Sequence, residues 1–525
     1  MDKKWLVVVL VLALCCGMLP AAVAEEPIVL SIGKGWDGSG TAYPEGHSVE
    51  NNYYLDYVRE KAGVEIQFDW VLADASQKVA LAVASGSMPD VMLVDQMTYD
   101  MLLNSDMLLP MTEAYESAAP DTLIEFVYSL FPEALEAGYV GDELMSLPST
   151  ASLHNHNVCW IRQDWLDNLG LDTPETLDDL VNVARAFVEN DPDGNGADDT
   201  IGIALKDDPF GNMTSNYDLQ PIAGAFHAFP GIWYAQEDGS MVYGSVTDTF
   251  RDTLEFLAGL YADNLLYKEF AVGDAEELVI NGQCGLAFGQ WSFSAFALRQ
   301  SHTLDGADWV PILCPLDEDG KFVAYERQPV GNYVVVSKNC KNPEAVIDVI
   351  NAEYSFHWGI DLDEEWAAKL LEYESIGVLY ANMPIEVGME RSHTIPERRD
   401  GFAQYLETGS LEGLSSSVQS YVNSYIEWLD DPTSLTGWAW YRGMYLAGGL
   451  LLDERVDADV QVAFWGVTET MEDMWTTLET MEEETIVKII MGEASIDAYD
   501  AFVESWYALG GEQITQEVQA YVDSR

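Results

Sequence analysis

One short acidic segment, residues 191–202, carries oxygen-bearing side chains at a regular spacing. Counted from its first residue, such side chains stand at positions 1, 3, 5 and 9, and a glycine stands at position 6. The groups offered to a cation are the side chains of Asp191, Asp193, Asn195, Asp199 and Thr200 and the backbone carbonyl of Ala197. Calcium is bound by about six to eight oxygens around a tight turn. The spacing therefore predicts a loop that binds Ca²⁺ in a structural role.

The same segment departs from the EF-hand calcium motif at its last position. Position 12 of that motif is a glutamate that binds calcium through both carboxylate oxygens, whereas this chain has Gly202 there. A true EF-hand is therefore excluded. The alternative is a solvated acidic turn, because Asp-Gly and Asn-Gly pairs favour turns with or without a cation.

The first hundred residues alternate between strand and helix patterns. Strands are predicted at residues 28–32, 64–70 and 91–94, and helices at residues 51–62 and 77–84. This alternation is typical of an α/β domain with a mostly parallel sheet. Ligands of such sheets bind beyond the carboxyl ends of the strands, which directs attention to Trp36 and Asp95.

A second lobe is predicted after residue 150. Residues 161–171 end a strand and open a helix, and residues 174–180 begin another helix with Thr173 as its N-cap. A later strand at 333–336 and a helix at 343–351 return the chain to the first lobe, and residues 400–525 are mainly helical. We expect an N-terminal lobe of residues 25–155 plus about 300–375, and a C-terminal lobe of residues 156–299 plus about 376–525.

The length and charge of the chain limit the classes of function that it can have. A chain of 525 residues suggests two or three domains. Its 24 basic and 89 acidic residues give a net charge of −65, which repels nucleic acid and anionic lipid. Residues 1–24 have the charged start, short apolar core and Ala-x-Ala end of a secretory signal peptide. The protein is therefore expected outside the cell, with lipid anchoring at Cys15 or Cys16 as the alternative to cleavage after Ala24.

The remaining cysteines and the usual catalytic motifs give weaker information. Four cysteines follow the signal peptide, namely Cys159, Cys284, Cys314 and Cys340. They can be paired in three ways or can be free and buried. The sequence contains no GxSxG, HExxH, P-loop or GxGxxG motif after a strand. A catalytic pair of carboxylates stays open, because so many acidic residues make a search uninformative.

The C-terminal segment, residues 475–521, resembles the signature of large extracellular solute-binding proteins, the capture subunits of ABC importers. Its resemblance is to the carbohydrate-type group that includes alginate-oligosaccharide binders. The acidic segment resembles the calcium loop of that group, which has an acidic residue where this chain has Thr200. One calcium ligand of the group is therefore in question here.

The resemblance also marks candidate ligand contacts. Residues 281–291 are similar to a strand of maltodextrin-type binding proteins that ends in Gly-x-Trp, which places Trp291 where a tryptophan stacks on a sugar ring. Residues 86–95 resemble another element of the same superfamily, after which Asp95 faces the ligand, while Asp90 is expected to be a turn residue. Weaker candidates are Trp36, Trp233, Trp438, Trp440, Tyr441, His154 and Asn155. The alternative for each tryptophan is a place in the hydrophobic core.

The family implies a two-lobed, periplasmic-binding-protein-like α/β fold of type II with a mostly helical C-terminal region. It implies capture of a solute, here an oligosaccharide, between the lobes and delivery to the permease subunits of an ABC transporter. The chain would act as a monomer and perform no chemistry on its ligand. Two alternatives stay open: a secreted glycoside hydrolase or lyase, and a binding-fold sensor for a non-sugar ligand.

Overall fold

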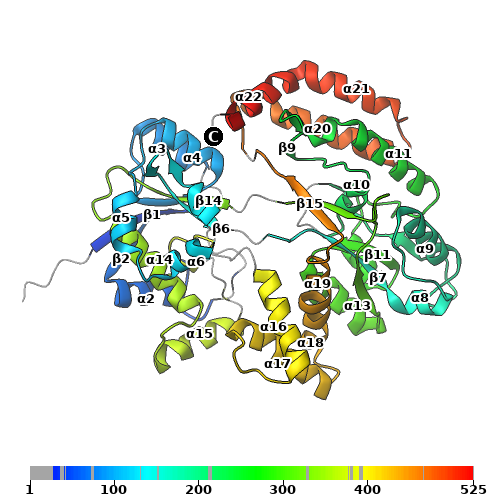
Figure 1. Cartoon of the computed structure of the whole chain (residues 1–525), viewed down its shortest axis with the longest axis horizontal. Coiled ribbons are helices and arrows are strands. Elements are labelled where there is room, and N and C mark those ends of the chain that lie inside the picture. The colour runs from blue at the N-terminus through cyan, green and yellow to red at the C-terminus, as the bar shows by residue number, and fades with distance from the viewer. Residues whose placement is uncertain are drawn as a thin grey trace, which may run out of the picture. The chain divides into compact units, whose positions relative to one another are not determined.

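The computed structural model describes residues 28–35, 41, 43–72, 76–130, 132–150, 153–210, 216–326, 330–376, 378, 382–388, 394–464 and 466–523. The expected signal peptide, Cys15, Cys16 and Trp36 lie outside the described residues. The chain divides into two compact units, whose elements are labelled in Figure 1. Unit 1 comprises residues 1–129, 135–148 and 332–387, and unit 2 comprises residues 130–134, 149–331 and 388–525.

Unit 1 is built on a five-stranded sheet with the strand order β2-β1-β3-β14-β6. These strands are β1 (Ile28–Lys34), β2 (Val64–Val71), β3 (Val91–Val94), β6 (Leu147–Thr150) and β14 (Val330–Val336). β1 pairs in parallel with both β2 and β3, whereas β14 is antiparallel to β3. The predicted mostly parallel sheet is therefore confirmed for its first three strands.

The helices of this part of the chain include those predicted at residues 51–62, 77–84 and 343–351. They are α2 (Tyr53–Ala62), α3 (Ser76–Ser85), α4 (Gln96–Asn104), α5 (Thr112–Ala118), α6 (Leu123–Leu130), α7 (Pro132–Glu136), α14 (Glu344–His357) and α15 (Glu364–Ile376), and a short hairpin is formed by β4 (Tyr139–Val140) and β5 (Glu143–Leu144). α2 begins two residues later than predicted, because the side chain of Asn52 accepts from the backbone N–H of Leu55 and caps the helix. It ends at Gly63, whose φ of 67° lies in the left-handed region.

Unit 2 contains a four-stranded sheet with the order β12-β7-β11-β8. Its strands are β7 (Val158–Arg162), β8 (Ile201–Ile203), β11 (Cys284–Gly289) and β12 (Trp309–Ile312), and two further ribbons pair β9 (Trp233–Ala235) with β10 (Met241–Tyr243) and β13 (Phe322–Glu326) with β15 (Val456–Gln461). All residues of β7 and β11 are buried. Continuous apolar runs of this kind suit central strands covered on both faces.

The helices of unit 2 cover this sheet and extend through the C-terminal region. They are α8 (Gln163–Leu169), α9 (Leu177–Glu189), α10 (Gln220–Gly224), η1 (Gly244–Val246), α11 (Asp248–Ala262), α12 (Ala275–Ile280), η2 (Trp291–Ala295), α13 (Ala297–Asp305), α16 (Thr394–Thr408), α17 (Ser416–Asp430), α18 (Leu435–Trp440), η4 (Tyr441–Ala447), α19 (Gly448–Leu450), α20 (Glu469–Ile490), α21 (Asp497–Trp506), η5 (Tyr507–Gly511) and α22 (Glu512–Asp523). The predicted helical character of residues 400–525 is confirmed, with β15 as an exception.

The predicted N-cap at Thr173 is wrong. The cap of α9 is Thr176, whose hydroxyl accepts from the backbone N–H of Asp179 while the Asp179 carboxylate accepts from the backbone N–H of Thr176. This reciprocal capping box satisfies two backbone N–H groups that would otherwise be unpaired. Thr173 lies before this cap and outside the helix.

The predicted lobe boundaries also need correction. The chain re-enters unit 1 at residue 332 rather than near residue 300, because β12 pairs with β7 and so keeps the intervening segment in unit 2. It leaves unit 1 after residue 387 rather than near 376, and the first crossing follows residue 148 rather than 155. Sequence periodicity identifies a strand but not its neighbour in the sheet, so it cannot place these crossings.

Two further expectations concern the cysteines and the membrane. Cys159, Cys284, Cys314 and Cys340 are free and buried, which is one of the two predicted alternatives. Burial raises the pKa of the Cys159 thiol well above its ordinary value, so this side chain behaves as a small apolar group. Among the described residues, the structure has no helix of the length and hydropathy needed to cross a membrane.

Candidate functional site

Three half-buried aromatic side chains from different elements of unit 2 form a row. The ring centroids of Trp291, in η2, and Trp440, at the end of α18, are 6.0 Å apart with planes at 35°. The ring of Tyr421, in α17, lies 4.9 Å from Trp440 at 71°. Each of the three side chains keeps part of its surface in solvent. We call Trp291, Trp440 and Tyr421 the aromatic row.

Close packing between η2 and the helices that follow it fixes the row. A Cβ at Gly443 would lie 2.5 Å from the carbonyl oxygen of Trp291, so only glycine lets η4 approach η2 this closely. The Ser294 hydroxyl donates to the carbonyl oxygen of Ala439 at 2.8 Å and adds a directional tie. The close approach of η4 to η2 and the Ser294 hydrogen bond are both buried. Backbone packing therefore fixes the positions of Trp291 and Trp440 relative to each other.

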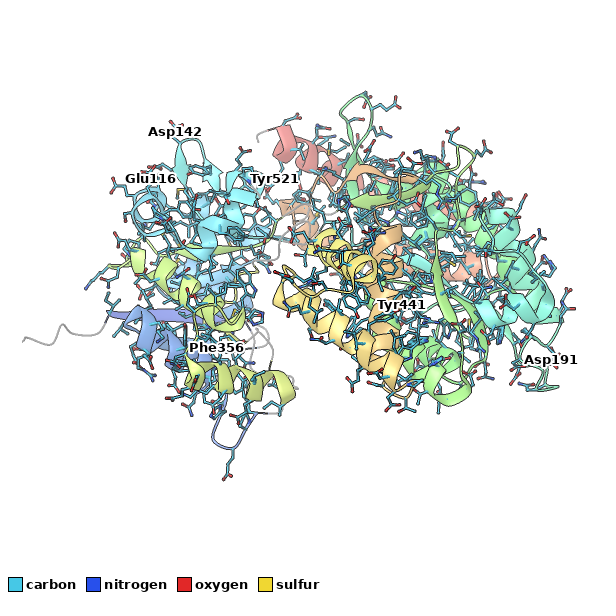
Figure 2. The ribbon with its side chains drawn as sticks, turned by 60° about the horizontal axis from the view of Figure 1, so that its bottom comes forward. Glu116, Asp142, Asp191, Phe356, Tyr441 and Tyr521 are labelled. Atoms are coloured by element: carbon cyan, nitrogen blue, oxygen red, sulfur yellow. The ribbon has the colours of Figure 1, made fainter. Side chains whose placement is uncertain are left out.

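Tyr441 lies next to the row in sequence but belongs to a different stack. Its ring is 5.2 Å from Tyr425 and 5.4 Å from Tyr445, with interplanar angles of 25° and 26°. Figure 2 labels Tyr441 among the helices of unit 2. The stack packs against the small core around Phe402, so the predicted ligand contact at Tyr441 is only half-exposed and serves packing as well.

Trp233 and Trp438 are removed from the candidate site, because both are core residues. Trp233 is 4 % exposed and packs against Tyr243 and Trp506, with centroids 5.2 and 6.2 Å away. Trp438 is 1 % exposed and stacks on His302 at 4.5 Å, and the Arg442 guanidinium lies 4.4 Å from its ring centroid. Neither side chain offers a face to a ligand.

His154 and Asn155 lie on the loop that follows the first crossing into unit 2. The backbone N–H of His154 donates to both carboxylate oxygens of Glu326 at 3.1 Å, and its Nδ1 lies 3.2 Å from Glu326 Oε1. The Glu326 carboxylate raises the pKa of His154, against a smaller opposing effect of burial. Asn155 has a buried Oδ1 without a hydrogen bond to any described residue. The contact of His154 with Glu326 joins two segments of unit 2, one just after the first crossing and one just before the chain re-enters unit 1 at residue 332.

The neighbouring His156, which the sequence places in the same polar loop, is a buried polar group. It is 3 % exposed, neither ring nitrogen has a hydrogen-bond partner among the described residues, and burial lowers its pKa to about 4. It lines a small cavity together with Gln220 and Phe322. The cavity volume of about 20 Å³ gives room for about one water molecule, which is the simplest partner for the imidazole.

In unit 1, Asp95 stands at the carboxyl end of β3, as predicted, and is exposed. Its Oδ1 accepts from the backbone N–H of Thr98 at 2.8 Å and caps α4. Asp90 has the expected turn role, because its carboxylate accepts from the backbone N–H and hydroxyl of Ser31 and joins β1 to the turn before β3. A cap role explains Asp95 without a ligand, so its ligand contact stays a prediction.

Trp70 is a residue that the sequence reasoning did not single out as a candidate. It is half-buried near the carboxyl end of β2, and its indole lies over Gly33 of β1, where a Cβ would stand 2.4 Å from the ring. The sequence could have suggested it, because Trp70 ends a predicted strand and ligands of parallel sheets bind at the carboxyl ends of the strands.

The acidic loop lies between α9 and β8, and Figure 2 labels its first residue, Asp191. The backbone N–H of Gly196 donates to Asp191 Oδ2 at 3.0 Å. The Asn195 side-chain amide donates to Asp193 Oδ2 at 2.8 Å and to Asp199 Oδ1 at 3.3 Å. Asp191 Oδ1 is buried and accepts no hydrogen bond from the described residues. The carboxylates of Asp193 and Asp199 thus share the NH₂ group of Asn195.

Carboxylates of the acidic loop repel one another, but the acidic side chains of the described residues do not form a metal-binding cluster. Burial raises the pKa of Asp193, and the carboxylates of Asp191 and Asp199 raise it further. Within the described ranges, no three His, Cys, Asp or Glu side chains stand close enough together to hold a metal ion. A Cβ at Gly202 would lie 2.6 Å from the carbonyl oxygen of Leu265, so packing forbids the glutamate of an EF-hand. Sequence reasoning excluded that motif correctly.

Comparison with curated proteins gives relatives over the whole chain and over part of it. The polygalacturonan/rhamnogalacturonan-binding protein YtcQ of Bacillus subtilis (strain 168) is 23% identical over 537 residues, covering 99% of both chains. Lipoprotein LipO of the same organism is 32% identical over 244 residues, covering 44% of this chain and 45% of LipO. The chain therefore shares its full length with at least one binding protein.

Solved structures share the fold. A solute-binding protein of Bifidobacterium longum infantis, described as binding HMO, matches with a TM-score of 0.64 at 15% identity and covers 95% of this chain and 99% of its own. The alginate-binding protein AlgQ2, solved without calcium ion, matches with a TM-score of 0.58 at 17% identity, covering 95% and 98%. The predicted binding-protein-like α/β fold is thus confirmed.

A family model gives the identification. The model described as bacterial extracellular solute-binding protein matches residues 47–354, which is more than half of the 525 residues. The match includes all of β2, β3, β7 and β11, together with Trp291. The chain belongs to the bacterial extracellular solute-binding proteins.

Proposed function

We propose that this protein captures an oligosaccharide and delivers it to the permease subunits of an ABC importer. The observation that carries the proposal is the aromatic row, in which Trp291 and Trp440 are held rigidly with part of each ring in solvent. Aromatic faces suit the C–H faces of sugar rings, and neighbouring polar groups bind the hydroxyls. The names of YtcQ and of the Bifidobacterium protein point to the same ligand class.

Reversible binding without chemistry is part of the proposal. The family is one of binding proteins, and a capture protein must release its ligand intact. A secreted glycoside hydrolase or lyase would use the same aromatic stacking but would leave a cleaved product. The fate of the sugar therefore separates the two readings more directly than affinity does.

A structural calcium ion in the acidic loop is a second part of the proposal. The buried Asp191 Oδ1 without a partner and the Asn195 amide between two carboxylates support it. A half-turn of the Asn195 amide would present its oxygen in place of its NH₂ group, and the Ala197 carbonyl is available beside it. The calcium ion would neutralise the mutual repulsion of Asp191, Asp193 and Asp199.

We further propose export by the signal peptide and action as a monomer. The family description is extracellular, and one relative is a lipoprotein, which keeps anchoring through Cys15 or Cys16 as the alternative to cleavage after Ala24. The net charge of −65 favours a chain that stays apart from other copies of itself.

Thermal unfolding of residues 25–525 with a panel of oligosaccharides tests the proposal. A ligand at about 100 times its Kd adds about 2.7 kcal/mol to the free energy of unfolding, a shift of several degrees. Chromatography of the sugar afterwards shows whether it is intact. A stabilising sugar recovered uncut supports capture, a stabilising sugar recovered as fragments supports the enzyme, and no shift with any sugar contradicts a carbohydrate ligand.

A further inference from the structure

Arg398, on α16, stands at the Tyr421 end of the aromatic row without a carboxylate partner. Its guanidinium lies 5.9 Å from the centroid of Tyr421, within the range of a cation–π contact. In the part of the chain that the structure describes, it makes no ion pair, and it is half-buried. Other arginines of unit 2 do pair with acidic side chains, namely Arg162, Arg185, Arg251, Arg442 and Arg455.

The absence of a partner is unexpected in this chain. Acidic residues outnumber basic ones by 89 to 24. Most arginines therefore have carboxylates nearby, and an arginine without an ion pair is uncommon among the described residues. A guanidinium that lies over a ring keeps its in-plane N–H groups for another partner. Arg398 therefore brings both a positive charge and unused donors to the end of the row.

The next residue, Arg399, adds a second positive charge on α16 but lies over the neighbouring tyrosine stack. Its guanidinium lies 5.6 Å from the centroid of Tyr445, and its Nη1 is 3.0 Å from Asp400, whose side chain is 68% exposed. An ion pair with so exposed a carboxylate contributes little and exchanges readily. The Arg399 Nε is buried and has no hydrogen-bond partner among the described residues.

We propose that Arg398 binds the carboxylate of an acidic sugar unit whose ring stacks on the aromatic row. The ligand class is then an oligosaccharide that contains uronate units. The inference rests on the proposed function and deepens it. Guanidinium groups bind carboxylates through paired, charge-assisted hydrogen bonds, which gives geometric selectivity that a lysine cannot supply.

The overall charge of the protein makes a local cation necessary for such a ligand. The field of a net charge of −65 disfavours an anionic sugar at the protein surface. A neutral sugar meets no such barrier and needs no arginine. The half-buried guanidinium of Arg398 beside the row is therefore better explained by an acidic ligand than by a neutral one.

The test compares acidic and neutral forms of the same sugar by isothermal titration. The probes are trisaccharides of galacturonate and of alginate, each with its carboxyl-reduced neutral counterpart. We expect the acidic form of at least one pair to bind about tenfold or more tightly than its reduced form, a difference of about 1.4 kcal/mol. Arg398→Gln should weaken binding of that acidic form about tenfold and leave binding of the neutral form unchanged.

Arg185→Gln is the matched control, because it removes an arginine of unit 2 that pairs with Asp263 outside the row. The unfolding temperature of each free variant shows whether it is folded. If both forms of every pair bind equally, or if Arg398→Gln weakens both forms alike, Arg398 only supports Tyr421 and the inference is wrong while sugar capture stands. If neither these probes nor any neutral oligosaccharide binds, the proposed function fails first.

Discussion

Unit 2 contains two groups of aromatic side chains that look alike in sequence and differ in surroundings. In the aromatic row, Trp291, Trp440 and Tyr421 are half-buried. In the second group, which we call the aromatic core, Trp233 and Trp506 are 4 % and 0 % exposed. The comparison teaches that residue type does not assign an aromatic side chain to ligand or core, whereas its packing partners do.

The aromatic core also holds a buried acid. The ring of Tyr243 stacks on Trp506 at 5.5 Å and 7°, and its hydroxyl donates to Glu482 Oε2 at 3.0 Å. The far end of the row meets the guanidinium of Arg398 instead of a buried acid. Substitutions in the core should therefore change stability, and substitutions in the row should change binding.

The largest effect is expected from Trp506→Ala. Removing a fully buried indole leaves a cavity and should lower the free energy of unfolding by about 3–5 kcal/mol. Urea unfolding, followed by circular dichroism, measures it. Trp440→Ala is the control within the comparison, and a variant of Trp506 that unfolds no more easily than that control would remove the distinction between core and row.

A pH effect should come next in size. Burial raises the pKa of Glu482 to about 7 from the ordinary value of 4.5. The folded protein then keeps a proton that the unfolded chain has lost, so the free energy of unfolding falls as pH rises from about 4.5 to 7. Glu482→Gln should flatten this dependence in urea unfolding at several pH values. An equal slope in both proteins assigns the pH dependence to other groups.

Calcium should affect stability without affecting the row. Adding Ca²⁺ should raise the unfolding temperature by several degrees, because the ion relieves repulsion among the loop carboxylates. Asp193→Asn should remove most of that shift, since it deletes a carboxylate at loop position 3. Sugar affinity of the folded variant should stay unchanged. A melting curve that is the same with calcium and with chelator contradicts a calcium loop.

The smallest effect is expected from Arg185→Gln. Arg185 and Asp263 form an ion pair whose side chains are 38% and 54% exposed, and pairs of this kind contribute little. Neither the unfolding temperature nor sugar affinity should change measurably. A clear loss of sugar affinity would mean that general charge, rather than the position of Arg398, controls binding.

Local patterns predicted the elements of unit 1 well. Strand and helix periods located β1, β2, β3, α2 and α3, because each pattern is contained in a short segment. Two expectations were wrong for different reasons. The cap of α9 is a local pattern, the capping box of Thr176 with Asp179, which gives a stronger cap than Thr173. The return to unit 1 comes later than predicted because β12 pairs with a strand far away in sequence, and no short segment shows that.

The candidate site was predicted only in part, for the same reason. Trp291 was marked by the strand before it, and Trp440 was named without a reason to prefer it over Trp438. Trp438 is buried against His302 and Arg442. Trp440, in contrast, keeps part of its surface exposed beside Trp291. The contact of Arg398 with Tyr421 joins two helices through tertiary packing. No spacing in the sequence announces such contacts.

The central claim is that the aromatic row, and not the aromatic core, meets the ligand. Isothermal titration of the best-binding oligosaccharide against the wild-type protein and Trp440→Ala tests it most directly. We predict about tenfold weaker binding by the variant, with an unfolding temperature of the free protein close to that of the wild type. Unchanged affinity in a folded Trp440→Ala variant would contradict the claim and return the row to a role in packing.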